Sequence, residues 1–185
     1  MRRSDWLISV LLALVMAAGG FWAASHYTNP ATTVNPETAP ELTGKSVPAY
    51  RLGSINGSLF TPADFSGQVV LYNFWATWCS PCRKEMPMLQ RFHEDHKAQG
   101  FTVVGIAIDD VQAVRKFTTD LGITYPVLVG ADDVMQVNRA FGNTSGSLPF
   151  SALVDKAGIV RWWDWGILEE DDLGQRVGAL LKSMD

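Results

Sequence analysis

Two nearly continuous apolar stretches, residues 69–75 and 101–108, stand out in the pattern of hydrophobic and polar positions. Both are rich in residues favoured in strands, and a strand covered on both faces has this pattern. Residues 83–99, between them, have helical spacing. The pattern therefore predicts a strand–helix–strand unit of an α/β sheet, with a site at the carboxyl end of the first strand.

Weaker patterns predict the other elements. They are a hairpin made by residues 50–52 and 58–60, a helical turn within 59–65, a helix at 109–121, a strand at 125–129, a helix at 132–141, a hairpin made by residues 151–154 and 159–165, and an amphipathic helix at 169–183. Asn56-Gly57 should form the turn of the first hairpin. Alternation puts Trp163 and Trp165 on one face of the last strand and Trp162 on the other, and core packing is favoured over a partner-binding patch for all three.

The N-terminal residues 6–24 carry no charge and follow Arg2 and Arg3. A helix of this length would span about 28 Å, close to the thickness of the hydrocarbon core of a bilayer. The positive-inside rule keeps the arginines in the cytoplasm. The sequence thus predicts a single-pass anchor in the inner (cytoplasmic) membrane, with the rest of the chain in the periplasm or outside. A cleaved signal peptide is the alternative, although the apolar run is longer than usual for one.

Residues 25–46 are rich in Thr, Pro, Ala and Asn and have no apolar period. They are predicted to be a flexible tether. Residues 47–185 should form one domain, because a chain of 185 residues with 47% hydrophobic content can bury one core of this size. The formal net charge is −4, with no basic cluster beyond the two N-terminal arginines, so nothing favours binding to nucleic acid.

The chain has only two cysteines, in the sequence Cys79-Ser80-Pro81-Cys82, where the first strand gives way to the helix. The free N–H groups and positive dipole at a helix start favour a thiolate, so Cys79 should titrate below the usual pKa of about 8.5. Cys82 lies about one helical turn further on, within reach for a disulfide. The pair is predicted to be a redox centre, with Cys79 attacking and Cys82 resolving.

Metal binding is the main alternative for a Cys-x-x-Cys pair. A zinc site needs two further Cys or His ligands. His93 and His96 lie several turns along the helix and are predicted to be solvated. A Cu(I) site using the two thiolates with Met86 or Met88 is chemically reasonable, although core packing is favoured for both methionines. We therefore predict no cofactor and no metal.

The stretch Trp78-Cys79-Ser80-Pro81-Cys82, with Pro87 further along the helix, resembles the centre of the thioredoxin superfamily. Asn73 stands where thioredoxin has a buried Asp, and Glu85 follows the second cysteine. This pattern is similar to the membrane-anchored TlpA/ResA-like branch. The resemblance implies a thioredoxin fold with an N-terminal β-hairpin and a central βα insertion, here preceded by one transmembrane helix.

The resemblance also implies roles for individual residues. Pro149 matches the cis-proline that faces the disulfide in this superfamily, and the backbone of Leu148 would pair with an extended substrate. Trp78 and Pro81 are expected to contact substrate. Glu85 should share the helix face of both sulfurs and exchange protons with them, whereas the alternative is a surface glutamate paired with a nearby cation.

The expected function is exchange of a dithiol and a disulfide with protein clients outside the cytoplasm, and the resemblance favours a reductant. A DsbD- or CcdA-like transmembrane donor would then supply electrons. Cytochrome c maturation is a narrower alternative, although residues 146–151 depart from the Gly-x-Pro-Glu-Thr of that branch. A copper-binding or chaperone protein using the same thiols is another alternative. The Thr-x-x-Cys arrangement of a peroxiredoxin-type peroxidase is absent.

Overall fold

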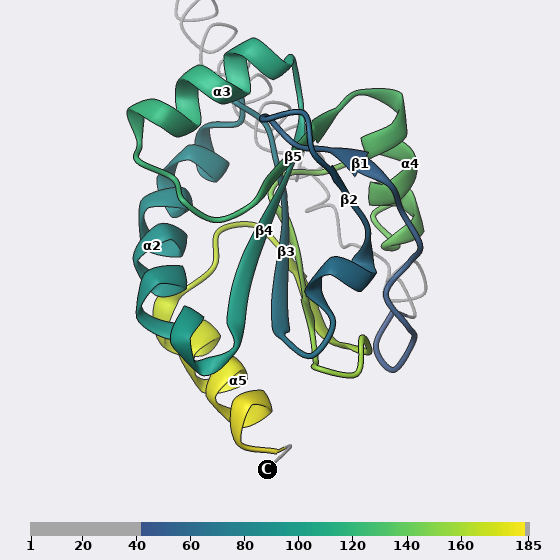
Figure 1. Ribbon diagram of the computed structural model, residues 1–185, viewed down its shortest axis with the longest axis vertical. Coiled ribbons are helices and arrows are strands. Elements are labelled where there is room, and N and C mark those ends of the chain that lie inside the picture. The colour runs from purple at the N-terminus through teal and green to yellow at the C-terminus, as the bar shows by residue number, and fades with distance from the viewer. Residues whose placement is uncertain (1–41, 184–185) are drawn as a thin grey trace, which may run out of the picture. The chain divides into compact units, whose positions relative to one another are not determined.

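A five-stranded sheet organises the part of the chain that the computed structural model describes, residues 42–183 (Figure 1). Its strand order is β5-β4-β3-β6-β7. The strands are β3 (Val69–Trp75), β4 (Phe101–Ile108), β5 (Val127–Gly130), β6 (Phe150–Val154) and β7 (Val160–Trp165). Strands β3, β4 and β5 run parallel, whereas β6 is antiparallel to both β3 and β7. The helix between β3 and β4 makes the predicted βαβ unit.

Helices cover both faces of this sheet (Figure 1). The α-helices are α2 (Ser80–His96), α3 (Val111–Asp120), α4 (Asp132–Ala140) and α5 (Glu170–Lys182). Short 3₁₀ helices are η2 (Pro62–Phe65) and η3 (Lys97–Gln99), and the N-terminal hairpin is β1 (Leu52–Gly53) with β2 (Leu59–Phe60). Residues of α2, α3 and α5 pack on one face, and residues of α4, β1 and η2 pack on the other.

Strand β3 is buried over its whole length, which explains its nearly unbroken apolar sequence. Leu71 and Trp75 point to the cluster under α2, whereas Tyr72 and Phe74 point to the cluster under α4. On the α4 side, the ring of Phe141 lies 5.2 Å from the rings of both Tyr72 and Phe74. The strand–helix–strand unit expected from the sequence is confirmed, and the α/β thioredoxin-like architecture with it.

The folded part begins earlier than the predicted boundary at residue 47. Leu42 is buried in the core, the Gly44 amide donates to the Val160 carbonyl at 2.8 Å, and the Val160 amide donates to the Lys45 carbonyl at 2.9 Å. These contacts add residues 42–46 to the edge of β7. The prediction that they belong to a flexible tether is wrong, because Leu42 finds a place in the core that the polar composition around it does not indicate.

The tryptophans of β7 pack as their alternation predicts. Trp163 and Trp165 contact each other and Phe150 on the α4 side of the sheet. Trp162 packs on the other face, where the Arg176 guanidinium lies 4.6 Å from its ring. All three are partly buried and pack against the core, as the favoured interpretation predicts.

Within residues 42–183 no helix is both long enough and apolar enough to cross a bilayer. The predicted membrane segment, residues 6–24, and most of the predicted tether lie outside the described residues.

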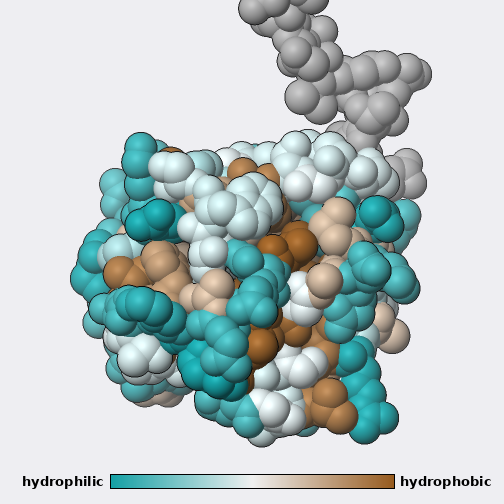
Figure 2. Space-filling view, turned by 90° about the horizontal axis from the view of Figure 1, so that it is seen from above, coloured by the Kyte–Doolittle hydropathy of each residue, from teal (hydrophilic) through white to brown (hydrophobic). Residues whose placement is uncertain are grey.

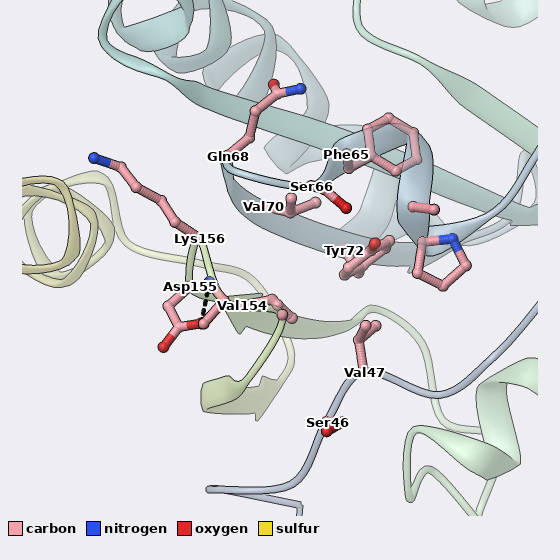
Figure 3. Close-up of a pocket in the computed structure, with 14 residues that line it drawn as sticks. Ser46, Val47, Phe65, Ser66, Gln68, Val70, Tyr72, Val154, Asp155 and Lys156 are labelled. Carbon is pink, nitrogen blue, oxygen red and sulfur yellow. Dashed lines mark hydrogen bonds between the residues drawn. The ribbon is translucent and has the colours of Figure 1, made fainter. Parts of the chain in front are cut away.

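A hollow of about 250 Å³ lies at the end of the sheet where β3 begins, between η2 and the β6–β7 turn (Figure 3). Its walls include Phe65, Tyr72 and Val154, with Asp155 and Lys156 at the turn. The cysteines follow the opposite end of β3, so this hollow is separate from the redox centre.

Candidate redox active site

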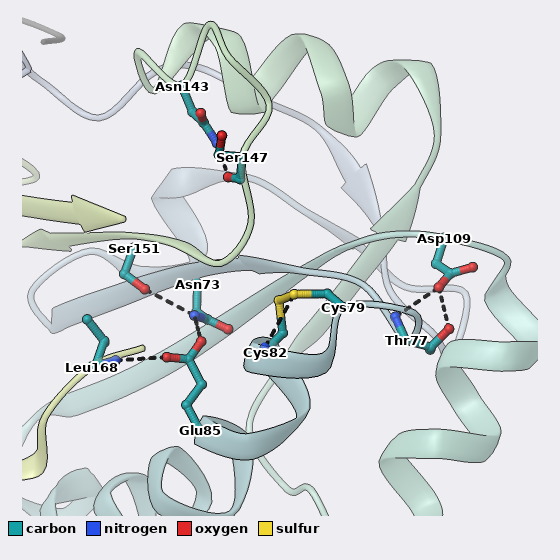
Figure 4. The surroundings of a disulfide bond; sticks show 10 residues. All are labelled: Asn73, Thr77, Cys79, Cys82, Glu85, Asp109, Asn143, Ser147, Ser151 and Leu168. Atoms are coloured by element: carbon teal, nitrogen blue, oxygen red, sulfur yellow. Dashed lines mark hydrogen bonds between the residues drawn. A yellow bond between two sulfur atoms is a disulfide. The ribbon is translucent and has the colours of Figure 1, made fainter. Parts of the chain in front are cut away.

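The two cysteines form a disulfide at the start of α2 (Figure 4). Cys79 is the N-cap of the helix, and its Sγ accepts a hydrogen bond from the Cys82 amide at 3.3 Å. The Cα atoms are 5.3 Å apart, as expected for residues one turn apart. Both predictions, the helix start at Cys79 and a disulfide within reach, are confirmed.

The surroundings make the two sulfur atoms unequal. Cys79 retains 5% exposure in the disulfide form, whereas Cys82 is fully buried. Trp78, next to Cys79, is 68% exposed, and Pro81 occupies the first turn of α2, where a missing N–H costs nothing. A partner can therefore approach from the side of Cys79.

Glu85 is buried on the same helix, two turns from Cys79, with 2% of its surface exposed. One carboxylate oxygen accepts from the Asn73 amide at 2.9 Å, and the other accepts from the Leu168 backbone N–H at 3.1 Å (Figure 4). Burial raises the pKa of Glu85 to about 7, against the opposing effect of these two hydrogen bonds. The alternative of a surface glutamate paired with a nearby cation is wrong, and Glu85 can hold or release a proton near neutral pH.

Asn73 connects Glu85 to the sheet. Its amide also donates to the Ser151 hydroxyl at 3.0 Å, and Ser151 is its direct neighbour across β3 and β6. The sequence pattern alone did not predict a role for Asn73 or Ser151. Asn73 is the one side-chain amide in an otherwise apolar strand, and a buried polar side chain needs a hydrogen-bond partner. This could have indicated a buried partner for Asn73.

The Leu148-Pro149 peptide bond is cis, as the resemblance implies. Pro149 precedes β6, whose Phe150 pairs with Phe74 at the carboxyl end of β3. The proline therefore lies at the same end of the sheet as the disulfide; Ser147 and Ser151, two residues before and after it, are drawn with the disulfide in Figure 4. The Pro149 carbonyl accepts from the Gly166 amide at 2.9 Å. Among the described residues, no hydrogen bond uses the backbone of Leu148.

The loop before Cys79 is fixed by Asp109 at the end of β4. The Asp109 carboxylate accepts from the Thr77 amide at 2.9 Å and also from the Thr77 hydroxyl. The helix predicted at residues 109–121 would begin at Asp109, but α3 is capped by Asp110 alone. Asp109 instead joins two strand ends beside the disulfide.

His93 is buried, which corrects the prediction of a solvated side chain. It lies two turns after Glu85 on the face of α2 that meets the sheet, its Nδ1 accepts from the Val103 amide at 3.4 Å, and its ring packs against Tyr125. Burial lowers the pKa of His93. Met86 is also fully buried in the core. The described residues contain no cluster of three or more His, Cys, Asp or Glu side chains that could hold a metal ion.

This arrangement can exchange a disulfide by attack at one sulfur. The attacking sulfur sits at the positive end of a helix, the resolving sulfur is within bonding distance behind it, and a carboxyl group with a pKa near 7 lies on the same helix. Fold and site together define a thioredoxin-like protein of dithiol–disulfide exchange.

Comparison with known proteins identifies the family. The AhpC/TSA family model matches residues 39–163, more than half of the chain, and the chain belongs to this family. The thiol-disulfide oxidoreductase ResA of Geobacillus thermodenitrificans is 29% identical over 183 residues, covering 97% of this chain and 99% of the relative. ResA of Bacillus cereus (strain ATCC 10987) is 30% identical over 162 residues, covering 86% and 87%.

Solved structures agree with this result. A thioredoxin-family thiol:disulfide interchange protein from Chlorobium tepidum superposes with a TM-score of 0.68 at 27% identity, over 77% of this chain and 99% of that one. A secreted thiol-disulfide isomerase from Corynebacterium glutamicum gives 0.68 at 28% identity, over 74% and 86%. The chain is thus a thiol-disulfide oxidoreductase with a redox-active pair of cysteines.

Proposed function

We propose that this chain is an exported reductant of disulfides in protein clients, anchored in the cytoplasmic membrane by residues 6–24. The observation that carries the proposal is the disulfide at the start of α2 with the buried Glu85 on the same helix. The apolar N-terminal sequence behind Arg2 and Arg3 supports the anchor and the exported side. A periplasmic or outward-facing reductant needs electrons from across the membrane, so a DsbD- or CcdA-like transmembrane protein is the donor in this proposal.

In the reduced protein the Cys79 thiolate attacks one sulfur of the client disulfide. A mixed disulfide forms and the other client sulfur leaves as a thiolate. Cys82, as a thiolate, then attacks the Cys79 sulfur and releases the second client thiolate. Two electrons pass to the client, whose disulfide becomes two thiols, and the Cys79–Cys82 disulfide results.

Two further groups support this sequence of steps. A carboxyl group with a pKa near 7 can take the proton of the Cys82 thiol and return it when the donor reduces the protein again, and Glu85 fills this role. The unpaired backbone of Leu148, ahead of the cis-proline, can pair with an extended client segment, as an edge strand does. Trp78 and Pro81 would contact the same segment.

Trapping of clients tests the proposal. Cys82→Ser, expressed in the native host, should accumulate mixed disulfides with exported proteins through Cys79, because the resolving thiol is lost. Cys79→Ser, the matched control, should accumulate far fewer. An apocytochrome among the trapped proteins would support the narrower assignment to cytochrome c maturation.

Two outcomes would contradict parts of the proposal. If Cys82→Ser traps no exported protein but the double cysteine variant still suppresses aggregation of clients, the chain is a chaperone and exchange is not its function. Recovery of the protein in the soluble exported fraction, beginning near residue 25, would show a cleaved signal peptide and reject the anchor.

A further inference from the structure

Three large hydrophobic side chains are exposed on segments next to the redox site, namely Trp78, Leu121 and Ile167. The other one exposed among the described residues, Leu59, lies in β2 of the N-terminal hairpin. Trp78 precedes Cys79 in the chain, and Ile167 lies in the β7–α5 loop, whose amides bond to Pro149 and Glu85. Figure 2, which looks onto the end of the molecule where α3 lies, shows hydrophobic residues bordered by hydrophilic ones on this face. Apolar surface bordered by polar residues is typical of places where another protein binds.

Leu121 lines an open groove of about 400 Å³ beside the cysteines. The other lining residues are Ser80, Arg83, Lys84 and Phe117, from the first turns of α2 and from α3. Ser80 follows Cys79 directly, so one end of the groove lies at the residue next to the attacking cysteine. Its floor is apolar, since Phe117 and Leu121 contribute a ring and a branched side chain.

The rim of this groove is positively charged. The Arg83 guanidinium lies 5.4 Å from the centre of the Phe117 ring, and Lys84 is exposed next to it. Within residues 42–183 neither cation forms an ion pair, whereas Lys116 on α3 is paired with Asp120. The positive end of the 17-residue helix α2 adds to the same potential. Among the described residues, the groove thus offers two positive charges that have no carboxylate partner, beside an apolar floor.

We infer that this groove, which we call the α2–α3 groove, binds a client segment in which an acidic side chain stands next to an apolar one. This rests on the proposed function, because the bound segment carries the cysteine that Cys79 attacks. The apolar side chain would lie on Phe117 and Leu121, and the carboxylate would lie between Arg83 and Lys84. The groove would then select clients by the sequence around their cysteine.

The rise of α2 per residue sets the distance between the client cysteine and the acidic side chain. Lys84 is five residues after Cys79, about 7.5 Å along the axis of α2. An extended client advances about 3.3 Å per residue, so the acidic side chain should stand two or three residues from the client cysteine. A glutamate placed much further along the client would miss the rim.

Three matched peptides test this inference, each with one disulfide and a leucine beside the variable position. The third residue after the reactive cysteine is Glu, Gln or Lys, and the release of peptide thiol on mixing with the reduced full-length protein, in a single turnover, gives the second-order rate constant for each peptide. The parent should favour the Glu peptide over the Lys peptide about 5- to 20-fold at low salt, with Gln between them. About 0.5 M NaCl should reduce this ratio strongly, because exposed charges are screened.

A charge reversal at Lys84 tests whether the preference for the Glu peptide arises in the α2–α3 groove. Lys84→Glu should lower the Glu/Lys ratio at least about 5-fold. The ratio is the useful quantity, because any change in the reactivity of Cys79 affects all peptides equally. Lys182→Glu makes the same change in net charge at the far end of α5 (Figure 1) and should leave the ratio within about 2-fold of the parent.

Equal rates for the Glu and Lys peptides in the parent would overturn the inference, as would equal effects of the two charge reversals. If the proposed function itself were wrong, the reduced protein would release no thiol from any of the three peptides, so the two failures can be distinguished.

Discussion

The buried carboxyl group of Glu85 should make the stability of the protein depend on pH. In the unfolded chain Glu85 ionises at the ordinary value of about 4.5, and in the folded protein burial raises the pKa to about 7. Between these values the folded state binds more protons than the unfolded state, so the free energy of unfolding falls as pH rises from about 4.5 to about 7. A pKa change of this size corresponds to about 3 kcal/mol.

Glu85→Gln removes this dependence at a constant cost. The amide of Gln has one acceptor oxygen, so either the Asn73 amide or the Leu168 N–H loses its acceptor and meets another donor. This costs about 1–2 kcal/mol at every pH. The variant should therefore be less stable than the parent at pH 5 and more stable by about 1 kcal/mol at pH 8, with the sign reversing between these values.

Urea unfolding of the oxidised protein at several pH values, followed by far-UV circular dichroism, measures this difference. Burial also lowers the pKa of His93, but His93 is present in both proteins, so its contribution cancels when they are compared. Glu169→Gln, at an exposed glutamate ahead of α5, is the matched control and should change stability by less than about 0.5 kcal/mol at both ends of the range. A difference between Glu85→Gln and the parent that is the same at pH 5 and pH 8 would refute the argument.

Three further predictions concern the reactivity and packing of the site. In the reduced protein, iodoacetamide should alkylate Cys79 before Cys82 near neutral pH, since Cys79 caps the helix and Cys82 is fully buried; peptide mapping that finds Cys82 labelled first would reverse the assignment. Glu85→Gln removes a negative charge near the thiolates, so it should lower the pKa of Cys79 and shift the equilibrium with glutathione toward the reduced protein while slowing turnover; a variant unchanged in alkylation profile and equilibrium would show no coupling. Gly105→Ala should cost about 1–3 kcal/mol in urea unfolding, because the added Cβ would lie 3.1 Å from each of two buried aromatic side chains; an unchanged midpoint would show that these rings can move aside.

The sequence predicted the elements whose patterns are local. Strand β3 at residues 69–75 and strand β4 at residues 101–108 have the predicted bounds, because each strand is covered on both faces and its apolar run ends where the cover ends. The cysteine pair was equally accessible to prediction, since the helix start and the spacing of one turn both follow from a few consecutive residues.

The rest depends on contacts between distant segments. Glu85 was placed on the correct helix. Its buried carboxylate, however, is held by hydrogen bonds from Asn73 and from the Leu168 amide, which is 83 residues away in sequence. The residues around His93 in the chain are mostly polar, as in a solvated helix, yet its side chain faces β4 and Tyr125. No periodicity in one segment reveals which face another segment will cover.

The hydrogen bond from the Leu168 amide to Glu85 makes the site tolerant of sequence change in the β7–α5 loop. A backbone N–H is present whatever side chain stands at that position, so most substitutions of Leu168 retain the donor even where they disturb the packing. Proline is the exception, since it has no N–H to donate. The surface of this loop can therefore change while the buried carboxyl group of Glu85 keeps the same backbone partner.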